Sequence, residues 1–305
     1  MNKIKILLGP SQMGKPAVDK LKSHGFEVIP NPYKRKLTKG ELKTLLVSVD
    51  GIVAGLEPLD REIIEGSDLK VISRCGSGIT NVDLDAAKEA GIHFSYTPFG
   101  PTASVAEMTL CNILALLRNI PIVNHKMHQK KWEKNTGNLL SGKTVVIIGF
   151  GKIGRAVADL LKPFKVKLLV VDPYIKELKY NGKADITFLK DALPVADIIL
   201  LHTSSDKPIL TRETTKLVNS GAYILNAARG TLIEEDALID ALKSNRIAGA
   251  WLDVFVDEPY SGPLCDFENV ILTPHISSYT AEGRLNMENE AVENLIRGFK
   301  ESGLM

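Results

Sequence analysis

The sequence predicts an α/β fold made of two domains, each built on a parallel sheet. Short β-rich apolar runs alternate with longer amphipathic runs along the whole chain, which is typical of parallel α/β folds. The length of 305 residues corresponds to two domains of roughly 150 residues each. Hydrophobic residues make up 44% and charged residues 24% of the chain, so we exclude a disordered, collagen-like or coiled-coil protein.

The first α/β unit fills residues 1 to about 98. Each of its apolar runs is short and is followed or preceded by a stretch with helical spacing. We expect strands at residues 5–8, 26–29, 51–53, 71–73 and 92–94, and helices at residues 14–23, 61–65 and 84–90.

A long helix then leads out of this unit. Ser104 and Glu107 form the Ser-x-x-Glu pattern of a capping box, with Ser104 as the N-cap and the apolar run 108–117 as the helix body. After a polar stretch, a second α/β series predicts the strands of a complete dinucleotide-type sheet, at residues 145–148, 168–171, 198–201, 223–225, 250–252 and 270–272.

A glycine motif follows the first strand of this second series. Gly149, Gly151 and Gly154 fit G-x-G-x-x-G between an apolar strand and a helix that ends near Pro163. The first glycine permits a tight turn, the second lets the backbone approach a pyrophosphate, and the third lets helix and strand pack closely. The N–H groups at the start of the helix would face the phosphate charge. The sequence therefore predicts a dinucleotide site.

Asp172, at the end of the next strand, indicates which dinucleotide binds. It lies 18 residues after Gly154, where an acid can accept hydrogen bonds from the ribose hydroxyls and repel a 2′-phosphate. Pro173 and Tyr174 follow it, and no arginine stands there to hold a phosphate. We expect NAD rather than NADP; the alternative is that Asp172 only caps a turn at the strand end.

Three later strands are each followed by one ionisable residue: Arg229, Glu258 and His275. In open parallel sheets the ligand crevice lies outside the carboxyl ends of the strands, so these residues can converge on a cofactor. Arg can grip a carboxylate with two hydrogen bonds, His can exchange a proton near neutral pH, and a carboxylate can orient the imidazole. These are the needs of alcohol-to-ketone oxidation beside a carboxylate. Taken singly, the three residues are also compatible with a surface charge, a loop cap and a packed histidine.

The chain resembles the D-isomer-specific 2-hydroxyacid dehydrogenase family over nearly its whole length. The segments that carry the resemblance include Arg74-Cys-Gly-Ser-Gly-Ile-Thr-Asn-Val-Asp83, the glycine loop, Asn226-Ala-Ala-Arg229-Gly, Asp257-Glu-Pro259 and Thr273-Pro-His-Ile276. The resemblance implies two Rossmann-like or flavodoxin-like domains with parallel sheets: a discontinuous substrate domain of residues 1–98 and 280–305, and an NAD-binding domain of residues 99–279. It also implies a homodimer and a C-terminal helix, residues 286–300, that completes the first domain.

The same resemblance implies the roles of individual residues. Arg229 would clamp the substrate carboxylate and carbonyl, His275 would be the acid/base that contacts the substrate, and Glu258 would be its partner. The loop formed by Gly76, Ser77 and Gly78 would bind the substrate carboxylate. Cofactor contacts would come from the motif glycines and from Ser77, Thr109, Lys152, Ile153, Asp172, Thr203, Ala227, Ala228, Arg229, Asp253, His275, Ser277 and Ser278.

The implied activity is NAD-dependent hydride transfer at C2 of a small D-2-hydroxy acid or 2-keto acid, of the phosphoglycerate, glycerate/hydroxypyruvate or glyoxylate kind. Two departures from the family bear on the substrate. Ser204-Ser205-Asp206 stands where the family often has Pro-Leu, and loop 54–58 lacks the basic residue of many phosphoglycerate enzymes, which disfavours a phosphorylated substrate. Because the sequence stops at residue 305, we expect no appended regulatory domain. Two alternatives stay open: an NAD(H)-sensing interaction protein like the co-repressors of this fold, and an enzyme that uses the same machinery to oxidise a different substrate, such as formate or phosphite.

The rest of the sequence argues against other partners. The net charge is +2, and the nearest approach to a basic block is Lys34-Arg35-Lys36, so we expect no nucleic acid partner. We expect no membrane span, and three scattered cysteines fit a reducing cytoplasm. His125 and His128 have no third ligand nearby, so we expect a solvated helix face and no metal site. We expect Trp132 and Trp251 to be packing residues.

Overall fold

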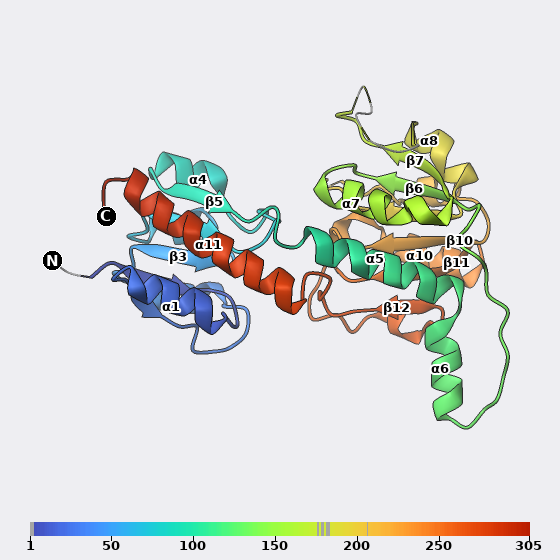
Figure 1. The fold of residues 1–305 in the computed structure, drawn as a ribbon, viewed down its shortest axis with the longest axis horizontal. Coiled ribbons are helices and arrows are strands. Elements are labelled where there is room, and N and C mark those ends of the chain that lie inside the picture. Colours follow the sequence, from blue (N-terminus) through green and yellow to red (C-terminus); the bar gives the residue numbers. More distant parts are fainter. Residues whose placement is uncertain (1–2, 176, 178–179, 181–183, 206) are drawn as a thin grey trace. The chain divides into compact units, whose positions relative to one another are not determined.

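The computed structural model describes residues 3–175, 177, 180, 184–205 and 207–305 (Figure 1). Its backbone contacts divide the chain into two compact units, Met1–Pro101 with Tyr279–Met305, and Thr102–Ser278. Both units are parallel α/β structures, and the first is assembled from both ends of the chain, so the predicted fold class is confirmed.

The first unit has a five-stranded sheet in the order β2-β1-β3-β4-β5, with every pairing parallel. Its strands are β1 (Lys5–Leu8), β2 (Glu27–Ile29), β3 (Gly51–Ala54), β4 (Val71–Arg74) and β5 (His93–Tyr96). They match the predicted strands closely because each is a short apolar run bounded by turn residues. Since all strands are parallel, the loops that follow them begin at one edge of the sheet.

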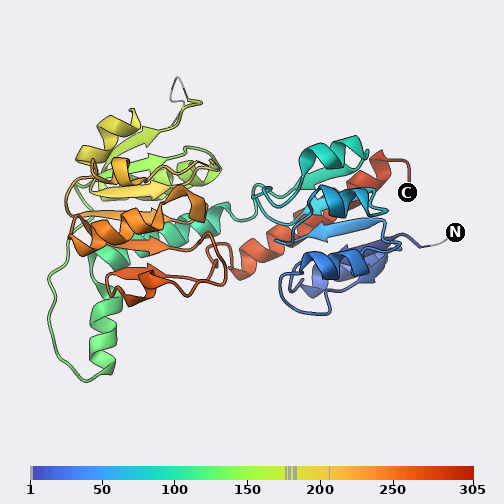
Figure 2. The same cartoon turned by 180° about the vertical axis from the view of Figure 1, so that it is seen from behind.

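Helices cover both faces of this sheet (Figures 1 and 2). One face packs against α1 (Lys15–Ser23) and α11 (Ala281–Glu301), and the other against α2 (Lys39–Leu45), α3 (Arg61–Glu65) and α4 (Leu84–Glu89). The apolar side of α11 includes Leu295 and Phe299, both fully buried, and it contacts β3, β4 and β5. The returning C-terminal helix therefore forms part of the core of the first unit.

Two helices of the first unit differ from the sequence analysis. The expected start of the last helix at residue 286 is wrong: α11 begins at Ala281, because the Thr280 hydroxyl accepts a hydrogen bond from Gly283 N at 2.9 Å and caps the first turn. Helix α2 was not predicted, although Thr38 and Glu41 form a complete capping box at its start.

The second unit has a seven-stranded parallel sheet in the order β12-β11-β10-β9-β6-β7-β8. All the predicted strands are present, and the additional edge strand β8 has only two residues, both exposed, which is too short for an alternating pattern to show. The strand order reverses at β6, which has β7 on one side and β9 on the other; open α/β sheets bind ligands at such a switch point. The strands are β6 (Thr144–Ile148), β7 (Lys167–Val171), β8 (Asp185–Ile186), β9 (Ile198–Leu201), β10 (Ala222–Asn226), β11 (Ile247–Leu252) and β12 (Val270–Leu272).

Helices also cover both faces of the second sheet. On one face α5 (Thr102–Leu117) packs against α7 (Lys152–Leu161), and on the other lie α8 (Leu189–Ala192) and α10 (Glu235–Lys243), with α9 (Arg212–Thr215) beside α10. Helix α6 (Ile120–His128) projects from the end of α5 and leads into an extended segment that returns to β6 (Figure 1). Short 3-10 turns occur at Lys162–Phe164, Leu193–Val195, Gly230–Leu232 and Pro263–Asp266.

Two expectations for the second unit are wrong. Helix α5 begins at Thr102, directly after Pro101, whose fixed φ suits the start of a helix; Ser104 is therefore a buried residue of the first turn and not the N-cap. Trp132 is 80% exposed rather than packed. Trp251, in contrast, is fully buried in β11, and His125 and His128 are exposed on α6, as predicted.

Within the described residues, no single helix has the length and hydropathy needed to cross a bilayer; α5 and α6 meet this test only as a pair, bent by 66°.

Candidate active site

The glycine loop joins β6 to α7 in the second unit. Gly149 has a φ of +92°, and a Cβ atom there would lie 2.6 Å from the backbone N of Thr203 at the end of β9. A Cβ atom on Gly154 would lie 2.3 Å from the carbonyl oxygen of Gly149. Both positions therefore require glycine, because the loop is held directly against β9 and against the first turn of α7.

Gly151 serves a different purpose in the same loop. A Cβ atom placed on Gly151 would have no other atom within 4 Å, so the backbone here faces open space. It is the N-cap of α7, whose start has no side-chain cap and no acidic residue in the first turn. Lys152 is exposed and Ile153 half-buried at this helix start. The loop and the first turn of α7 thus fit the pyrophosphate of a dinucleotide, which backbone N–H groups and the helix dipole favour.

Asp172 is half-buried just after β7. Its Oδ2 accepts a hydrogen bond from Phe150 N at 2.8 Å, and its Oδ1 accepts one from Tyr174 N at 3.0 Å. The residue therefore caps the turn after β7, as the alternative interpretation held, and also ties this turn to the glycine loop. A carboxylate can accept about four hydrogen bonds, so capacity remains for ribose hydroxyls, and that contact stays a prediction.

Arg229 follows β10 on a loop that Asn226 shapes. The buried Asn226 side chain accepts a hydrogen bond from Ala228 N at 3.0 Å and donates one to Arg229 O at 2.8 Å. Arg229 Nη1 donates to Ala228 O at 2.7 Å, whereas the buried Nε has no hydrogen-bond partner among the described residues. A buried donor without a partner is costly, so this guanidinium is arranged to receive an acceptor such as a carboxylate.

Gly230 brings the loop of Arg229 against the loop that leads to Glu258. A Cβ atom on Gly230 would lie 2.1 Å from the carbonyl carbon of Phe255 and 2.4 Å from Val256 N. No side chain fits between the two backbones. The loops after β10 and β11 are therefore in direct contact, as expected for residues that follow neighbouring parallel strands.

Glu258 and His275 form a pair. His275 Nδ1 lies 3.0 Å from Oε2 and 3.2 Å from Oε1 of Glu258, and Oε1 also accepts a hydrogen bond from Phe255 N at 3.1 Å. His275 has a left-handed backbone with φ +56°, a conformation that costs energy in a non-glycine residue and is typical of functional sites. The side chains of His275 and Glu258 are 38% and 33% exposed, so a substrate can reach the imidazole. Because Nδ1 faces Glu258, Nε2 is the nitrogen that can exchange a proton with that substrate.

Asp253 anchors the loop that contains His275. This buried carboxylate accepts four hydrogen bonds: at Oδ1 from Thr273 Oγ1 (2.5 Å) and Ile276 N (2.9 Å), and at Oδ2 from Ser277 N (2.9 Å) and Ser277 Oγ (2.5 Å). The loop is thereby fixed on both sides of His275. Asp253 and Ser277 were expected as cofactor contacts; here their polar atoms engage each other, and contact with the cofactor stays a prediction.

His202, at the end of β9, was missed as a candidate. Its buried Nε2 has no hydrogen-bond partner among the described residues, and burial lowers the pKa of His202 to about 4, so the ring is neutral at neutral pH. The next residue, Thr203, accepts a hydrogen bond from Ser205 N at 3.4 Å. Asp206 lies outside the described residues.

The other predicted contacts of the second unit differ in accessibility. Thr109 is fully buried in α5, where its hydroxyl donates to Val105 O at 2.7 Å. Ala227, Ala228 and Ser278 are half-buried. Their contacts with the cofactor stay predictions.

In the first unit, the predicted carboxylate loop follows β4. Gly76 has φ +139°, its N donates to Thr97 Oγ1 at 2.6 Å, and a Cβ atom there would lie 2.4 Å from Arg74 Nη1. Ser77 is exposed and Gly78 half-buried, so the backbone beyond Gly76 is accessible. Burial raises the pKa of the neighbouring Cys75 thiol to about 12, which marks Cys75 as a packing residue.

A buried carboxyl group lies on the adjacent loop, after β3. Glu57 is fully buried; its Oε1 accepts a hydrogen bond from Gly55 N at 2.7 Å, and its Oε2 has no partner among the described residues. Burial raises the pKa of Glu57, while the charges of Arg74 and Lys36 act in the opposite direction. Asn81 connects this loop to the loop after β4, because its Nδ2 donates to Glu57 O at 2.7 Å and its Oδ1 accepts from Arg74 Nε at 3.3 Å.

Sequence comparison identifies a family and close relatives. The model of the D-isomer specific 2-hydroxyacid dehydrogenase NAD binding domain matches residues 110–277. Human D-3-phosphoglycerate dehydrogenase is 35% identical over 297 residues, which cover 93% of this chain and 55% of that protein. The Bacillus subtilis D-3-phosphoglycerate dehydrogenase is 36% identical over 239 residues, which cover 76% of this chain and 45% of that protein. The chain thus spans about half the length of these curated relatives.

Solved structures are similar over nearly the whole chain. The TT0316 protein from Thermus thermophilus has a TM-score of 0.90 at 31% identity and covers 98% of this chain and 97% of its own. A glyoxylate reductase from Paecilomyes thermophila has a TM-score of 0.88 at 27% identity, with coverages of 99% and 97%. A D-lactate dehydrogenase from Aquifex aeolicus, complexed with NAD and lactic acid, has a TM-score of 0.85 at 26% identity. The match covers 98% of this chain and 96% of that protein.

The family match covers more than half of the chain and includes the glycine loop, Arg229, Glu258 and His275. It confirms both the resemblance found in the sequence and NAD as the cofactor of the second unit. This chain belongs to the D-isomer specific 2-hydroxyacid dehydrogenase family.

Proposed function

We propose that this protein is an NAD-dependent dehydrogenase that interconverts a small D-2-hydroxy acid and the corresponding 2-keto acid. The observation that supports this most strongly is the Glu258–His275 pair, with Nδ1 at 3.0 Å from Oε2, next to the Arg229 loop in the NAD-binding unit. Oxidation of an alcohol beside a carboxylate requires an oriented imidazole and a guanidinium with a free donor, and the buried Nε of Arg229 has no acceptor among the described residues.

The proposed roles follow from the chemistry of each group. When bound, NAD would accept or donate the C2 hydride. The glycine loop and the first turn of α7 would hold the pyrophosphate, and Asp172 the ribose. His275 Nε2 would take the proton of the C2 hydroxyl in oxidation and return it in reduction, while Glu258 keeps the ring oriented.

The substrate carboxylate would be held by Arg229. Arg229 offers the planar fork of a guanidinium, which matches the two oxygens of a carboxylate. We propose separately that the first unit binds substrate at the Gly76–Gly78 loop, with the backbone N–H groups of residues 77 and 78 as its donors, because Gly76 N already donates to Thr97 Oγ1. The substrate would be of the phosphoglycerate, glycerate/hydroxypyruvate or glyoxylate kind, in keeping with the relatives named above.

The test is consumption of NADH with glyoxylate, hydroxypyruvate, pyruvate, 2-oxoglutarate and phosphohydroxypyruvate, each repeated with NADPH. We expect NADH to be oxidised with at least one keto acid, and faster than NADPH because of Asp172. If NADH binds but no keto acid oxidises it, the dehydrogenase proposal fails and the NAD(H)-sensing alternative replaces it.

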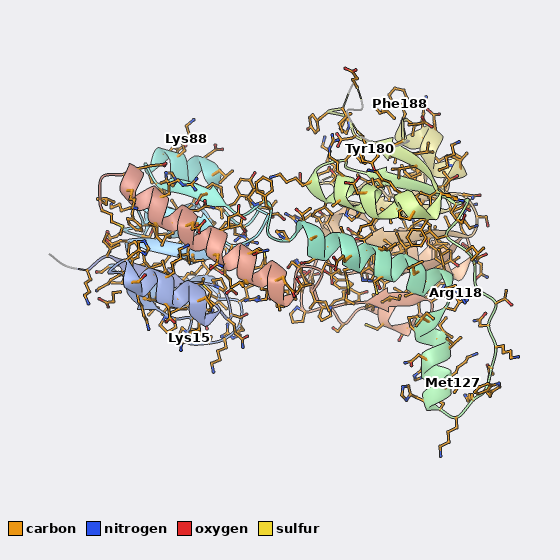
Figure 3. All side chains as sticks on the ribbon, in the orientation of Figure 1. Lys15, Lys88, Arg118, Met127, Tyr180 and Phe188 are labelled. Carbon is orange, nitrogen blue, oxygen red and sulfur yellow. The ribbon has the colours of Figure 1, made fainter. Side chains whose placement is uncertain are left out.

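We also propose that two copies associate through α6 and the segment that returns to β6. Large apolar side chains are exposed there: Ile120 (51%), Met127 (50%), Trp132 (80%) and Leu139 (74%). Figure 3 labels Met127 on α6. Apolar surface gathered on a projecting element is typical of a protein–protein interface. Light scattering after gel filtration should give a dimer mass for the wild type and a monomer mass for a Trp132→Asp, Leu139→Asp variant. Val47→Asp, at an exposed apolar residue of the first unit, is the control and should remain dimeric.

A further inference from the structure

The loop between β11 and β12 contains a tyrosine that the proposed function does not use. Tyr260 lies two residues after Glu258 and is half-buried, as is Phe255, three residues before Glu258. Both rings pack against the apolar core of the second unit. Residues 256–259, between the two rings, are all exposed. The segment that carries Glu258 is therefore an exposed stretch of chain held at each end by an aromatic ring.

The two rings also contact each other. Their centroids lie 4.3 Å apart and their planes are inclined by 17°, so Phe255 and Tyr260 are stacked. Phe255 in turn binds the carboxylate of Glu258, because its backbone N donates to Oε1 at 3.1 Å. The other oxygen of this carboxylate, Oε2, lies 3.0 Å from His275 Nδ1. A chain of direct contacts therefore leads from the Tyr260 ring, through Phe255 and Glu258, to the imidazole of His275.

The hydroxyl of Tyr260 fixes this ring to the second unit. It donates to Glu235 Oε1 at 3.0 Å, and Glu235 is the first residue of α10. It also accepts a hydrogen bond from the backbone N of the buried Leu264 at 3.2 Å. The chain turns closely around it, since a Cβ atom on Gly262 would lie 2.5 Å from Oη. Burial raises the pKa of Tyr260 to about 12, so the hydroxyl remains a donor well above neutral pH. The position of the ring is thus determined by α10 as well as by stacking.

The other end of the exposed segment is held by backbone packing. A Cβ atom on Gly230 would lie 2.1 Å from the carbonyl carbon of Phe255, so the two loops meet without a side chain between them. This packing involves no atom of Tyr260, and it restrains the loop of Arg229, which precedes Gly230. Replacement of Tyr260 would therefore loosen the segment on the far side of Glu258 and leave the Arg229 loop in place.

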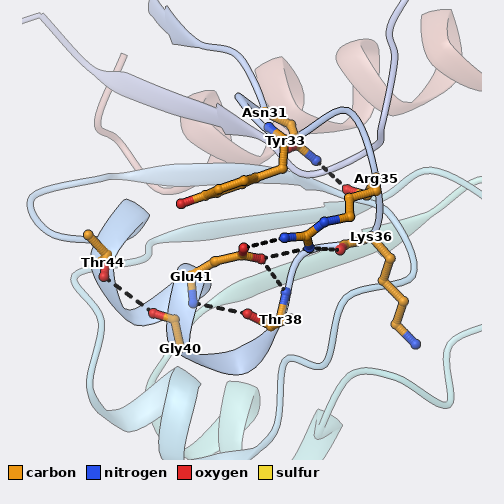
Figure 4. A network of polar contacts seen from close by, with 8 residues as sticks. All are labelled: Asn31, Tyr33, Arg35, Lys36, Thr38, Gly40, Glu41 and Thr44. Carbon is orange, nitrogen blue, oxygen red and sulfur yellow. Dashed lines mark hydrogen bonds and ion pairs between the residues drawn. The ribbon is translucent and has the colours of Figure 1, made fainter.

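Tyr33 in the first unit lies in another polar network but is bound differently (Figure 4). Its ring lies 5.0 Å from the Arg35 guanidinium, which binds Glu41 with hydrogen bonds of 2.6 and 3.0 Å. Tyr33 is 47% exposed, and its hydroxyl takes no part in the contacts that Figure 4 draws. That network uses only the ring of its tyrosine, whereas the contacts of Tyr260 use both the ring and the hydroxyl.

We propose that Tyr260 is a positioning residue of the dehydrogenase, which holds Glu258 in the orientation that directs His275 Nε2 to the substrate. This inference rests on the proposed function and adds to it a residue that acts through Phe255 and Glu258 rather than on the substrate. Reacting groups must be held within about 0.5 Å of their working geometry by the packing and hydrogen bonds of their neighbours. The stacked ring of Tyr260 supplies the packing, and its bond to Glu235 supplies the hydrogen bond.

Steady-state kinetics of two variants test this role, with the keto acid that the wild type reduces fastest. Tyr260→Leu removes the ring and the hydroxyl, and we expect kcat to fall by about tenfold or more, because misplaced reacting groups lower the rate steeply. Tyr260→Phe retains the ring and should lose about threefold, since only the hydroxyl contacts are removed. KM and the Kd of NADH should stay within about twofold, because Arg229 and the glycine loop are unchanged. A kcat of Tyr260→Leu within about twofold of the wild type, or a loss that appears in KM alone, overturns the proposal.

Phe267→Leu is the matched control for a loss of stability. Phe267 is a half-buried aromatic residue of the same loop and packs against the same core, but it lies beyond the turn Pro263–Asp266. Its replacement should lower the melting temperature, as Tyr260→Leu does, and leave kcat as in the wild type. An equal loss of kcat in Phe267→Leu and Tyr260→Leu overturns the proposal.

Glu235→Ala tests the anchor on α10. It removes the acceptor of the Tyr260 hydroxyl and should lower kcat about as much as Tyr260→Phe does, by about threefold. Both variants keep the stacked ring, so they test the role even if Tyr260→Leu does not fold. A wild-type kcat in both variants overturns the proposal.

The route through Glu258 is tested by combining substitutions. In a Glu258→Ala background, Tyr260→Leu should change kcat by no more than about twofold, because the carboxylate that it positions is absent. A loss as large as in the wild-type background would show that Tyr260 supports the structure in general, and it overturns the proposal.

An NMR measurement distinguishes failure of this inference from failure of the proposed function. Long-range ¹H–¹⁵N spectra of the histidine rings show which ring nitrogen carries the proton, and the signals of His275 are those absent from His275→Ala. In the wild type at alkaline pH we expect the proton on Nδ1, which faces Glu258, whereas Tyr260→Leu should give a mixture of tautomers, as Glu258→Ala does. This change supports the inference even if no keto acid oxidises NADH. Identical His275 signals in Tyr260→Leu and the wild type overturn it, whatever the outcome of the activity assays.

Discussion

Asp253 accepts two hydrogen bonds from Ser277, one from its backbone N at 2.9 Å and one from its Oγ at 2.5 Å. With the further bonds from Thr273 and Ile276, one buried carboxylate fixes the chain on both sides of His275. Trp251 extends this network into the core, because its Nε1 donates to Thr273 Oγ1 at 2.9 Å. The left-handed backbone of His275 is therefore held by groups that do not themselves need to touch the substrate.

Asp253→Asn replaces one carboxylate oxygen by an NH₂ group that cannot accept a hydrogen bond. We expect kcat to fall by about tenfold or more, because His275 is no longer fixed, and the free energy of unfolding to fall by about 1–3 kcal/mol. Steady-state kinetics and urea unfolding measure the two effects. Ser277→Ala removes only one of the four bonds and should change both quantities less; an unchanged kcat in Asp253→Asn would contradict the positioning role.

His275→Ala removes the proposed acid/base. We expect turnover to fall by a factor of about 10²–10⁴, because the variant lacks the imidazole Nε2 that exchanges the proton. NADH binding, followed by fluorescence, should be retained, since the glycine loop is unchanged. His24→Ala, at the exposed end of α1, is the control and should behave as the wild type. Retained turnover in His275→Ala would refute the assignment.

Arg229→Lys keeps the positive charge but loses the planar fork. We expect the apparent KM of the keto acid to rise by about tenfold or more, because an ammonium group cannot make two parallel hydrogen bonds to a carboxylate. Initial rates at varied substrate concentration measure this. Arg212→Lys changes an exposed arginine at the start of α9 and should leave KM as it is. A KM that does not respond to Arg229→Lys would exclude the clamp.

Two alanine substitutions in the glycine loop should have opposite consequences. Gly149→Ala places a Cβ atom 2.6 Å from Thr203 N in a backbone with φ +92°, so we expect a destabilised or insoluble protein. Gly151→Ala places its methyl group in open space, so the protein should fold with a normal melting temperature and bind NADH more weakly. Thermal melting and NADH titration distinguish the two. Normal NADH affinity in Gly151→Ala would show that the pyrophosphate does not lie against this loop.

His202 predicts a pH dependence of stability. Burial lowers its pKa to about 4, against 6.5 for the unperturbed side chain. Between these values the unfolded chain binds a proton that the folded chain does not, so this residue reduces stability as the pH falls through the window. His202→Gln removes this titrating group. When the pH is lowered from 7.5 to 5, the free energy of unfolding of the wild type should therefore fall by about 2 kcal/mol more than that of the variant. A difference independent of pH would show that the ring titrates normally.

The strands and the ends of the strands could be predicted from the sequence, and the contacts between loops could not. Arg229, Glu258 and His275 each follow a parallel strand, and a parallel sheet brings such positions to one edge, so their proximity could be inferred without coordinates. The four bonds of Asp253 join residues 20 to 24 positions apart and depend on how the loops fold back, which no local pattern encodes. The bonds of Asn226 to residues 228 and 229 are local, but no role was predicted for Asn226. The start of α5 was misplaced because Pro101 competes with the Ser104 capping pattern, and the structure follows the proline.

The path of the chain through the first unit fixes the order in which the protein can be completed during synthesis. Ile6, Leu8, Val53 and Val71 share one apolar cluster with Ala291, Leu295 and Phe299 of α11. All residues of the second unit, Thr102–Ser278, leave the ribosome before this helix does. The first unit is therefore begun before the second and completed after it, and its early strands keep one apolar face without the cover of α11 until translation reaches residues 281–301. Aggregation during synthesis, and any demand for a chaperone, should concentrate on that face.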